Sequence, residues 1–306
     1  MNKSLKIIIS ILLAWVISYF LFKRVDFPSL NEILKSGYNA LTFSFIAFFF
    51  IKLINTLRYS RLYEIESSIK LYSLLSYSNL MLSIVPFRIG ELSYIHGLEK
   101  YFNKKYREGT SKLIFLRFID YIVVCILFLL SSIHVYHTFG SGIIGLVSLF
   151  FIVSLILFLG FIYLITLNKT SFRGRLRKVV NVIHIGINNI RKMPKKILIS
   201  VVLLSLIYWI LRLVFGYIVL ILLGINVSIF VVAFISFFLL LGGITPIRPI
   251  LGFGLFEGGW TYFLVLMGYN YEKTLSLIFQ YHLILLIPSI VFGIMGYCYM
   301  KLYKKY

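Results

Sequence analysis

The stretch LGGITPIRPILGFGLFEGG, residues 241–259, decides the fold of this chain because it interrupts an otherwise apolar region. Pro246 and Pro249 each remove a backbone donor, and glycine is costly inside a helix, so no continuous helix is expected here. At membrane depth the freed backbone groups are tolerated only inside protein or beside water. Because Arg248 and Glu257 belong to the same stretch, it predicts a binding site, with a simple kink in an ordinary span as the alternative.

The composition is that of a polytopic membrane protein. Of the 306 residues, 60% are hydrophobic and 13% are charged. The longest polar segment, residues 168–196, is too short to fold a soluble catalytic domain with its own core, so any chemistry is expected in or at the bilayer. The formal net charge of +21 would suit nucleic acid. The basic residues, however, occupy short loops between apolar runs, where the positive-inside rule explains them, and no nucleic-acid partner is expected.

Six apolar runs are long enough to cross a bilayer, and two further runs are shorter or interrupted. The first run follows Lys3 and Lys6 and has no small-residue cleavage site, so it is expected to be a retained span rather than a signal peptide. The six runs are residues 5–22, 38–57, 113–136, 143–167, 197–223 and 274–300, and the interrupted runs are residues 71–97 and 229–268.

Lysine and arginine are distributed unevenly among the loops, and this predicts the topology. They crowd both ends of the chain and the loops at residues 58–70, 100–112 and 169–196. Placing these segments in the cytoplasm puts the N- and C-termini there as well. Residues 71–97 must then begin and end inside, and residues 229–268 must begin and end outside. Each is too short for two spans, so both are predicted to be re-entrant hairpins.

The predicted fold is an all-α polytopic membrane protein with six full transmembrane helices plus two re-entrant hairpins in an inverted repeat. Residues 1–306 form a single integral membrane domain, in which residues 38–136 are the first repeat and residues 197–300 the second. Residues 143–196 supply a connecting span and a basic cytoplasmic loop. The loop has apolar residues at helical spacing, which suits a helix on the inner leaflet, with a solvated linker as the alternative. Eight plain spans are the alternative to the repeat.

Seven charged residues remain at membrane depth, where each is costly unless it is paired or hydrated. Arg117 and Asp120 lie three apart on one helix and can pair directly. If the two breaks meet near the midplane, the set forms a net-positive pocket suited to a phosphate, to which arginine binds well. Half-helix N-termini at Glu91 and Glu257 would add backbone donors. The predicted substrate-binding residues are Arg88, Glu91, Arg117, Asp120, Arg212, Arg248 and Glu257, and the predicted break residues are Pro86, Gly90, Pro246, Pro249, Gly252 and Gly254.

Neither a metal nor an organic cofactor is predicted. Cys125 and Cys298 lie in apolar runs, which suggests neither a disulfide framework nor a metal site. Glu91 and Glu257 could form an acid–base couple, but no nucleophile, nucleotide-binding or Asp-rich metal motif accompanies them. The histidines lack metal-ligand spacing and are interpreted as interfacial; they are His96, His134, His137, His184 and His282.

Four elements of the sequence recur together in a known family. They are Arg58-Tyr59 closing the second span, PFRIGE at residues 86–91, RFID at residues 117–120, and Pro246 with GFGLFE at residues 252–257. In these elements the chain resembles, over essentially its whole length, the lysylphosphatidylglycerol synthase transmembrane region, also called the flippase-like integral membrane family. The resemblance implies a polytopic protein that moves lipids between leaflets, the best-understood relatives handling aminoacylated phosphatidylglycerol.

The sequence departs from those relatives in two ways. It lacks their cytosolic aminoacyl-transferase domain, so the resemblance does not imply lipid synthesis. The last span has Gln280, Tyr281 and His282 where an arginine is expected. Stand-alone relatives are often associated with envelope glycan pathways, so the resemblance also allows a polyprenyl-linked lipid.

The observations together favour a lipid translocator, flippase-like or scramblase-like, that moves an anionic phospholipid or a lipid-linked envelope intermediate between leaflets. One alternative is a membrane-embedded transferase with Glu91 or Glu257 as base. Another is a non-catalytic membrane partner of an envelope-synthesis complex. The expected partners are the bilayer and a lipid with an anionic headgroup; a homo-oligomer is left open.

Overall fold

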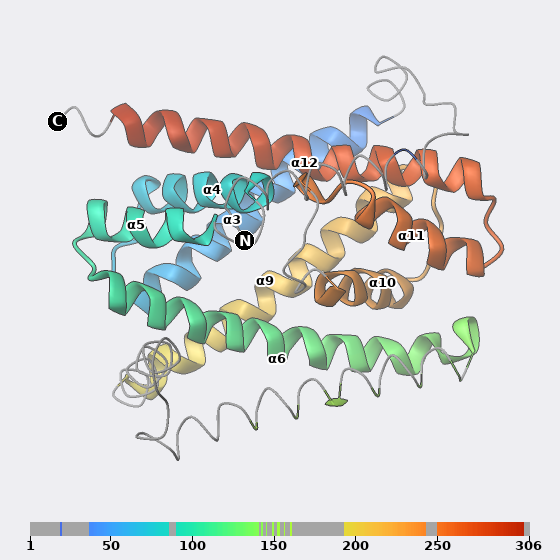
Figure 1. Cartoon of the computed structure of the whole chain (residues 1–306), viewed down its shortest axis with the longest axis horizontal. Helices are drawn as coiled ribbons and strands as arrows, with labels where there is room; N and C mark the ends of the chain where they lie inside the picture. The colour runs from blue at the N-terminus through green and yellow to red at the C-terminus, as the bar shows by residue number, and fades with distance from the viewer. Residues whose placement is uncertain are drawn as a thin grey trace. The chain divides into compact units, whose positions relative to one another are not determined.

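The long apolar runs form long helices in the computed structural model (Figure 1). It describes residues 37–85, 90–140, 193–242 and 250–302, together with Tyr19 and seven single positions between residues 142 and 160. Within these residues, 4 helices are long and apolar enough to cross a membrane. They are α3 (Tyr38–Tyr63), α6 (Tyr106–Phe139), α9 (Lys195–Leu222) and α12 (Tyr271–Leu302). They correspond to four of the predicted spans, whereas the runs at residues 5–22 and 143–167 fall largely outside the described residues.

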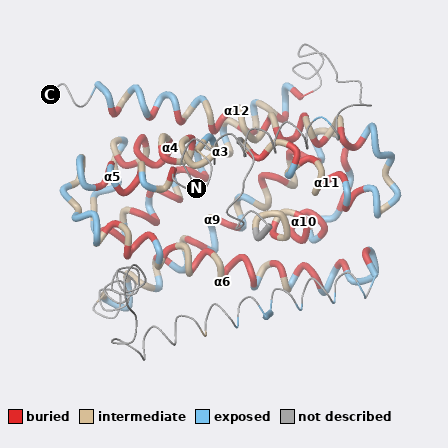
Figure 2. Tube along the Cα trace, viewed as in Figure 1, coloured by how far each residue is buried: buried red, intermediate tan, exposed pale blue. Residues whose placement is uncertain are grey.

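Large apolar side chains stay exposed along the long helices, as Ile133 on α6, Ile199 on α9 and Met295 on α12 illustrate. The pale-blue positions that alternate with red ones along α6 and α12 in Figure 2 mark these exposed faces. Such extensive apolar exposure is unfavourable in water and is expected of surfaces that face lipid. The chain is therefore an integral membrane protein.

Two pairs of shorter helices flank the predicted breaks. The first pair is α4 (Ile69–Ile84) and α5 (Glu91–Phe102). The second is α10 (Ile229–Gly242) and α11 (Leu255–Leu266), with a short 3-10 helix, η1 (Ile250–Gly252), before α11. The longest of the four, α4, has 16 residues, or about 24 Å at about 1.5 Å per residue, against a hydrocarbon core of about 30 Å. Neither pair has the length for two full spans.

The chain divides into two compact units. The first comprises Met1–Leu53, Ser68–Tyr94 and Ile210–Tyr306, and the second comprises Ile54–Ser67 and Ile95–Trp209. The repeat boundaries expected from the topology, residues 38–136 and 197–300, stay a prediction.

In the first unit, α4 packs along α12 (Figure 1). The α12 face is flat at Gly293 and Gly296, where an added Cβ would meet the Leu80 side chain and the Ser73 carbonyl of α4, respectively. Only glycine allows the two backbones to come this close, as at the small-residue interfaces of membrane helices. The glycines therefore fix how α4 lies on α12.

Polar and aromatic contacts complete this helix pair. Asn79 Nδ2 of α4 donates to Ser289 Oγ of α12 at 2.8 Å, which satisfies two polar groups away from water. One turn away on α12, the Phe292 ring stacks on Phe48 at 5.5 Å and contacts Tyr72 at 6.3 Å. The helix runs through Pro288 without ending there. These contacts hold α3, α4 and α12 together within the unit.

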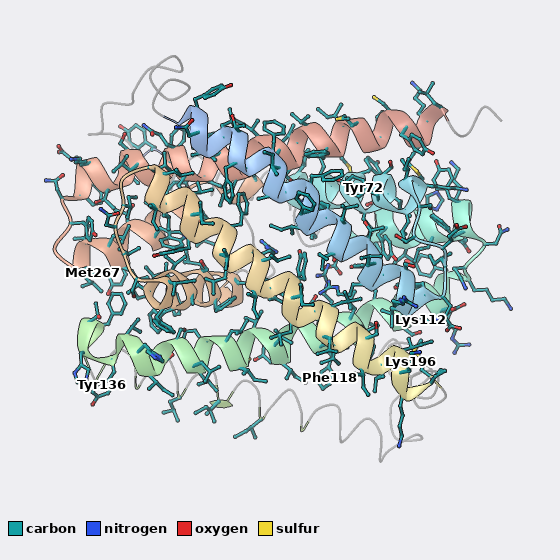
Figure 3. The ribbon with its side chains drawn as sticks, turned by 180° about the vertical axis from the view of Figure 1, so that it is seen from behind. Tyr72, Lys112, Phe118, Tyr136, Lys196 and Met267 are labelled. Atoms are coloured by element: carbon teal, nitrogen blue, oxygen red, sulfur yellow. The ribbon has the colours of Figure 1, made fainter. Side chains whose placement is uncertain are left out.

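In the second unit, the start of α6 packs against the end of α3 and against α5. Tyr63 Oη donates to the Gly109 carbonyl at 2.7 Å, and Gly109 lies against the Ile95 and Leu98 side chains. Lys112, labelled in Figure 3, pairs with Glu108 Oε1 at 3.0 Å on the same helix. These contacts anchor the part of α6 that leads to Asp120, two turns further along.

Candidate functional site

Asp120 of α6 lies at the centre of a buried polar cluster in the second unit. Arg58 of α3 makes a two-pronged contact with it, because Nη1 donates to Oδ1 at 2.6 Å and Nη2 donates to Oδ2 at 3.3 Å. Trp209 of α9 donates its Nε1–H to the same Oδ1 at 2.9 Å. One carboxylate thus joins three helices that are far apart in sequence. The geometry is the planar fork that makes arginine a strong partner of carboxylates.

The surroundings of Arg58 explain how its charge is held with only 2% of the residue exposed. The face of its guanidinium lies over the Tyr208 ring, with Cζ 4.6 Å from the ring centroid, which is a favourable cation–π arrangement. Ser205 Oγ accepts from Arg58 Nη1 at 3.4 Å while donating to the Val201 carbonyl. Arg58 Nε is buried and has no hydrogen-bond partner among the described residues. The guanidinium is therefore well supported at both Nη atoms, while Nε is buried without a hydrogen bond to the described residues.

Arg117 brings a second guanidinium to the same carboxylate. Its Nη1 lies 3.6 Å from Asp120 Oδ2, and its side chain is 37% exposed. The predicted pairing of Arg117 with Asp120 is thus present, but the shorter and bidentate contact is that of Arg58. Two guanidiniums therefore contact the one carboxylate of Asp120. Asp120 is the only acidic residue in the apolar part of α6, residues 113–139.

The position of Arg58 corrects the sequence interpretation. Arg58 was expected to open a basic cytoplasmic loop at residues 58–70, but α3 continues to Tyr63 and the side chain is buried. The physical reason is that Asp120, together with Tyr208 and Ser205, compensates the charge, which allows the helix to carry it past the apolar run.

A second buried cluster lies in the first unit, around Glu257 near the start of α11. Glu257 is fully buried, and its Oε2 accepts from the Gly254 backbone N–H at 2.7 Å, which closes the N-terminus of the helix. Its Oε1 lies 2.6 Å from His282 Nδ1 of α12, within hydrogen-bond distance. The His282 ring stacks on Phe256 at 4.4 Å. This cluster fastens the start of α11 to α12.

The interpretation of all five histidines as interfacial is wrong for His282, which is buried and paired with Glu257. His96, His134 and His137 are exposed, as expected, and His184 lies outside the described residues. His282 differs because α12 places it opposite a carboxylate that also needs a partner.

The predicted break residues that the structure describes have three local roles. Gly252 and Gly254 have φ of 84° and 83°, a region that glycine adopts without strain, and Leu251, in the middle of η1, has φ of 56°. Gly252 also lies beside the His282 ring. At Gly90, an added Cβ would collide with the backbone of Met81 and Leu82, so this glycine permits a close approach between the start of α5 and α4.

The other predicted binding residues are placed as follows. Glu91 is the first residue of α5 and is partly buried, a position where a carboxylate is stabilised by the helix dipole. Arg212 is an exposed residue of α9. Glu91, Arg212 and Glu257 belong to the first unit, and Arg117 and Asp120 to the second, where these two meet. Convergence of the whole set on one midplane site stays a prediction. The residues outside the described part are Pro86, Arg88, Pro246, Arg248 and Pro249.

The sequence interpretation missed four residues of these clusters: Arg58, Ser205, Trp209 and His282. Arg58 carried a signal, because it ends an apolar run and an intramembrane carboxylate requires a cation. Ser205 and Trp209 carried none, since serine and tryptophan are ordinary in apolar spans. His282 carried an indirect signal, because a carboxylate at membrane depth such as Glu257 requires a hydrogen-bonding or cationic partner.

We compared the chain with family profiles, with curated proteins and with solved structures. Neither the curated proteins nor the solved structures yielded a match. The profile of the family described as the lysylphosphatidylglycerol synthase TM region matches residues 5–293, nearly the whole chain. The match includes both clusters, from Arg58 to His282. The chain therefore belongs to the lysylphosphatidylglycerol synthase TM region family.

Proposed function

We propose that this protein is a lipid translocator that moves a lipid with an anionic phosphate headgroup between the two leaflets. Family membership supports a role in lipid handling. The observation that carries the finer proposal is the cluster of Arg58, Arg117 and Asp120, in which two guanidiniums share one carboxylate within an apolar helix. A guanidinium in such surroundings attracts an anion, and its planar donors match a phosphate.

Arg58 and Arg117 differ in solvent exposure, and we assign them different roles for that reason. Arg58 is buried and bound by the Asp120 fork, so its charge stabilises the helix contacts. The Arg117 side chain is 37% exposed and its contact with Asp120 is 3.6 Å long, so a headgroup phosphate can approach this guanidinium from its exposed side. Such a phosphate would contact Arg117 without breaking the Arg58–Asp120 pair. The positive charge of Arg117 on α6 thereby lowers the free energy needed to move an anionic headgroup into the apolar region of the bilayer.

The two pairs of short helices fit the predicted re-entrant hairpins. α4 ends at Ile84 and α10 at Gly242, next to the predicted breaks, and the backbone carbonyls at a helix end need partners at membrane depth. We propose that the pairs enter the bilayer from opposite faces and that both termini are cytoplasmic, as the loop charges predict. Such breaks are typical places for a transporter to bind a polar group.

The Glu257–His282 pair is the observation that favours a transferase, because a carboxylate-oriented imidazole is a common general base. Both side chains are buried, however, and the carboxylate also closes the start of α11. These contacts give the pair a sufficient role in the fold, so the translocator remains the better-supported function.

Translocation can be measured with purified protein in vesicles that contain phosphatidylglycerol with a fluorescent acyl chain. A membrane-impermeant reductant then bleaches only the label that reaches the outer leaflet. The wild-type protein should expose the inner-leaflet label, and Arg117→Gln should slow this roughly tenfold or more, the rate cost of losing a charged hydrogen bond. Arg117→Lys, which keeps the charge, should retain part of the rate.

The matched control is Arg107→Gln, since Arg107 is an exposed arginine near the start of the same helix. It should translocate as the wild type does. Equal rates for Arg117→Gln and the wild type would remove the cluster from the mechanism. A covalently altered lipid in the vesicles would favour the transferase instead.

A further inference from the structure

A shallow groove lies in the second unit where the end of α3 meets the first half of α9. Its volume is about 430 Å³, within the usual range of small-molecule sites. Two of its lining residues are basic, and most of the others are aliphatic. The lining that matters for the argument is formed by Leu57, Arg61, Lys196, Ile199, Leu203 and Ile207.

The groove is polar at one end and apolar along the rest. Lys196, labelled near the start of α9 in Figure 3, is followed by Ile199, Leu203 and Ile207 at helical spacing on one face. Arg61 stands one turn beyond Leu57 on α3. The two cations therefore mark the end of the groove where α3 finishes and α9 begins.

The length of the apolar wall matches one leaflet. From Lys196 to Ile207 the helix rises about 16 Å at about 1.5 Å per residue. Half of a hydrocarbon core of about 30 Å is about 15 Å. An acyl chain lying along this wall would place its headgroup beside Arg61 and Lys196. Ile199, Leu203 and Ile207 are exposed, so the chain would replace other lipid contacts without unpacking the helices.

The charges select an anionic headgroup. Arg61 and Lys196 are both exposed, and neither pairs with a carboxylate in the described part of the chain. Of the described residues that line the groove, none is acidic. Two like charges facing one groove repel each other, and a phosphate between them removes that repulsion. We propose that the groove binds an anionic phospholipid, with its phosphate at Arg61 and Lys196 and one acyl chain along α9.

The charge pattern also decides against two other occupants. Residues 161–192 precede α9 but carry lysines and arginines and no acidic residue, so the basic end of the groove would repel them. A second copy of the chain, which has formal charge +21, meets the same repulsion unless it presents one of its few carboxylates. A phospholipid provides both the apolar chain and the negative charge.

The groove runs from the basic end toward the level of the Arg58 cluster. Leu57 is next to Arg58 in α3, and Ile207 is two residues from Trp209 in α9. A lipid bound here lies at the edge of the cluster that the translocation proposal uses. The role of the groove as the loading site rests on that proposed function, whereas lipid binding to it does not.

Lipid binding is measured directly on the purified full chain, by native mass spectrometry of phosphatidylglycerol against phosphatidylcholine in detergent. The wild-type chain should prefer phosphatidylglycerol. The double variant Arg61→Gln/Lys196→Gln should lose about 30-fold in affinity for phosphatidylglycerol, from about fivefold for each cation near an anionic surface. The control is Lys195→Gln, an exposed neighbour that does not line the groove, and it should bind as the wild type does.

The apolar wall is tested with a photoreactive phosphatidylglycerol that carries its reactive group on the acyl chain. Cross-links should fall on residues 199–207 and disappear in Leu203→Trp, which fills the groove. They should persist in Val202→Trp, at an exposed position of α9 outside it. Lipid adducts that fall elsewhere on the chain, with none at residues 199–207, would overturn the proposal, as would unchanged binding in the double variant.

The two proposals can fail separately. Cross-linking at residues 199–207 in vesicles that show no translocation would uphold the groove and refute the translocator. Translocation by the wild type without any cross-link in the groove would refute the groove and uphold the translocator.

Discussion

Asp120→Asn should destabilise the protein, because it removes the counter-charge from the buried Arg58. An asparagine oxygen in the place of Oδ1 could still accept from Arg58 Nη1 and Trp209 Nε1. Its amide group would then face Arg58 Nη2, which lies 3.3 Å from Oδ2, donor against donor. Breaking a buried pair costs about 3–5 kcal/mol. We expect the lower end, about 3 kcal/mol, because polar groups of an unfolded chain in a bilayer or micelle also find partners.

The assay is unfolding in mixed micelles with increasing fraction of denaturing detergent. About 3 kcal/mol should shift the equilibrium roughly a hundredfold or more toward the unfolded state. The double variant Arg58→Met/Asp120→Asn, which removes both charges of the bidentate pair and keeps an acceptor for Trp209 Nε1, should be less destabilised than Asp120→Asn alone. Arg107→Gln serves as the surface control. If Asp120→Asn unfolds with the wild-type midpoint, the carboxylate does not hold Arg58 in the folded protein and the central cluster is refuted.

Two further predictions concern the first unit. Gly296→Leu should cost about 1–3 kcal/mol by pushing α4 off α12, whereas Gly145→Ala, at a helical position with open space, should not lower the unfolding midpoint. A Gly296→Leu midpoint at or above that of the wild type would contradict the packing. His282→Phe should cost about 3 kcal/mol because it leaves the Glu257 carboxylate buried without its imidazole partner, and His282→Gln, which can still donate, should cost about 1 kcal/mol. Unfolding curves in mixed micelles decide both, and equal costs for the two His282 variants would show that the hydrogen bond to Glu257 does not stabilise the fold.

The helices could largely be predicted from sequence, because apolar length is a local property. The runs at residues 38–57 and 113–136 became α3 and α6, each extended by polar or charged residues at its ends. The extension of α3 to Tyr63 could not be predicted from apolar length, since Arg58 and Arg61 match the composition of a cytoplasmic loop. The end of α4 at Ile84 agrees with the predicted effect of Pro86 on the backbone before it, whereas Pro86, Pro246 and Pro249 themselves lie outside the described residues.

The partners within each cluster were much harder to predict. Arg58 and Asp120 are separated by 62 positions and Trp209 by a further 89, and no local pattern links them. Arg117 and Asp120 were predicted to pair because they share one helix face, which is the kind of contact that spacing predicts. Glu257 was recognised as costly in the membrane, but the residue that compensates it lies on another helix. Long-range compensation depends on tertiary packing, which composition and spacing do not specify.

The hydrogen bond between Asn79 and Ser289 has a consequence for how the protein is made. The two residues are 210 positions apart, so α4 is synthesised long before the part of α12 that packs on it. At a synthesis rate of about 5–20 residues per second, Ser289 is added on the order of 10–40 s after Asn79. Until then the polar groups of α4 and the close-packing surface around Ser73 lack their partner helix. Chains that terminate before Ser289 should therefore be recognised and degraded by membrane quality control, even though most of their helices are complete.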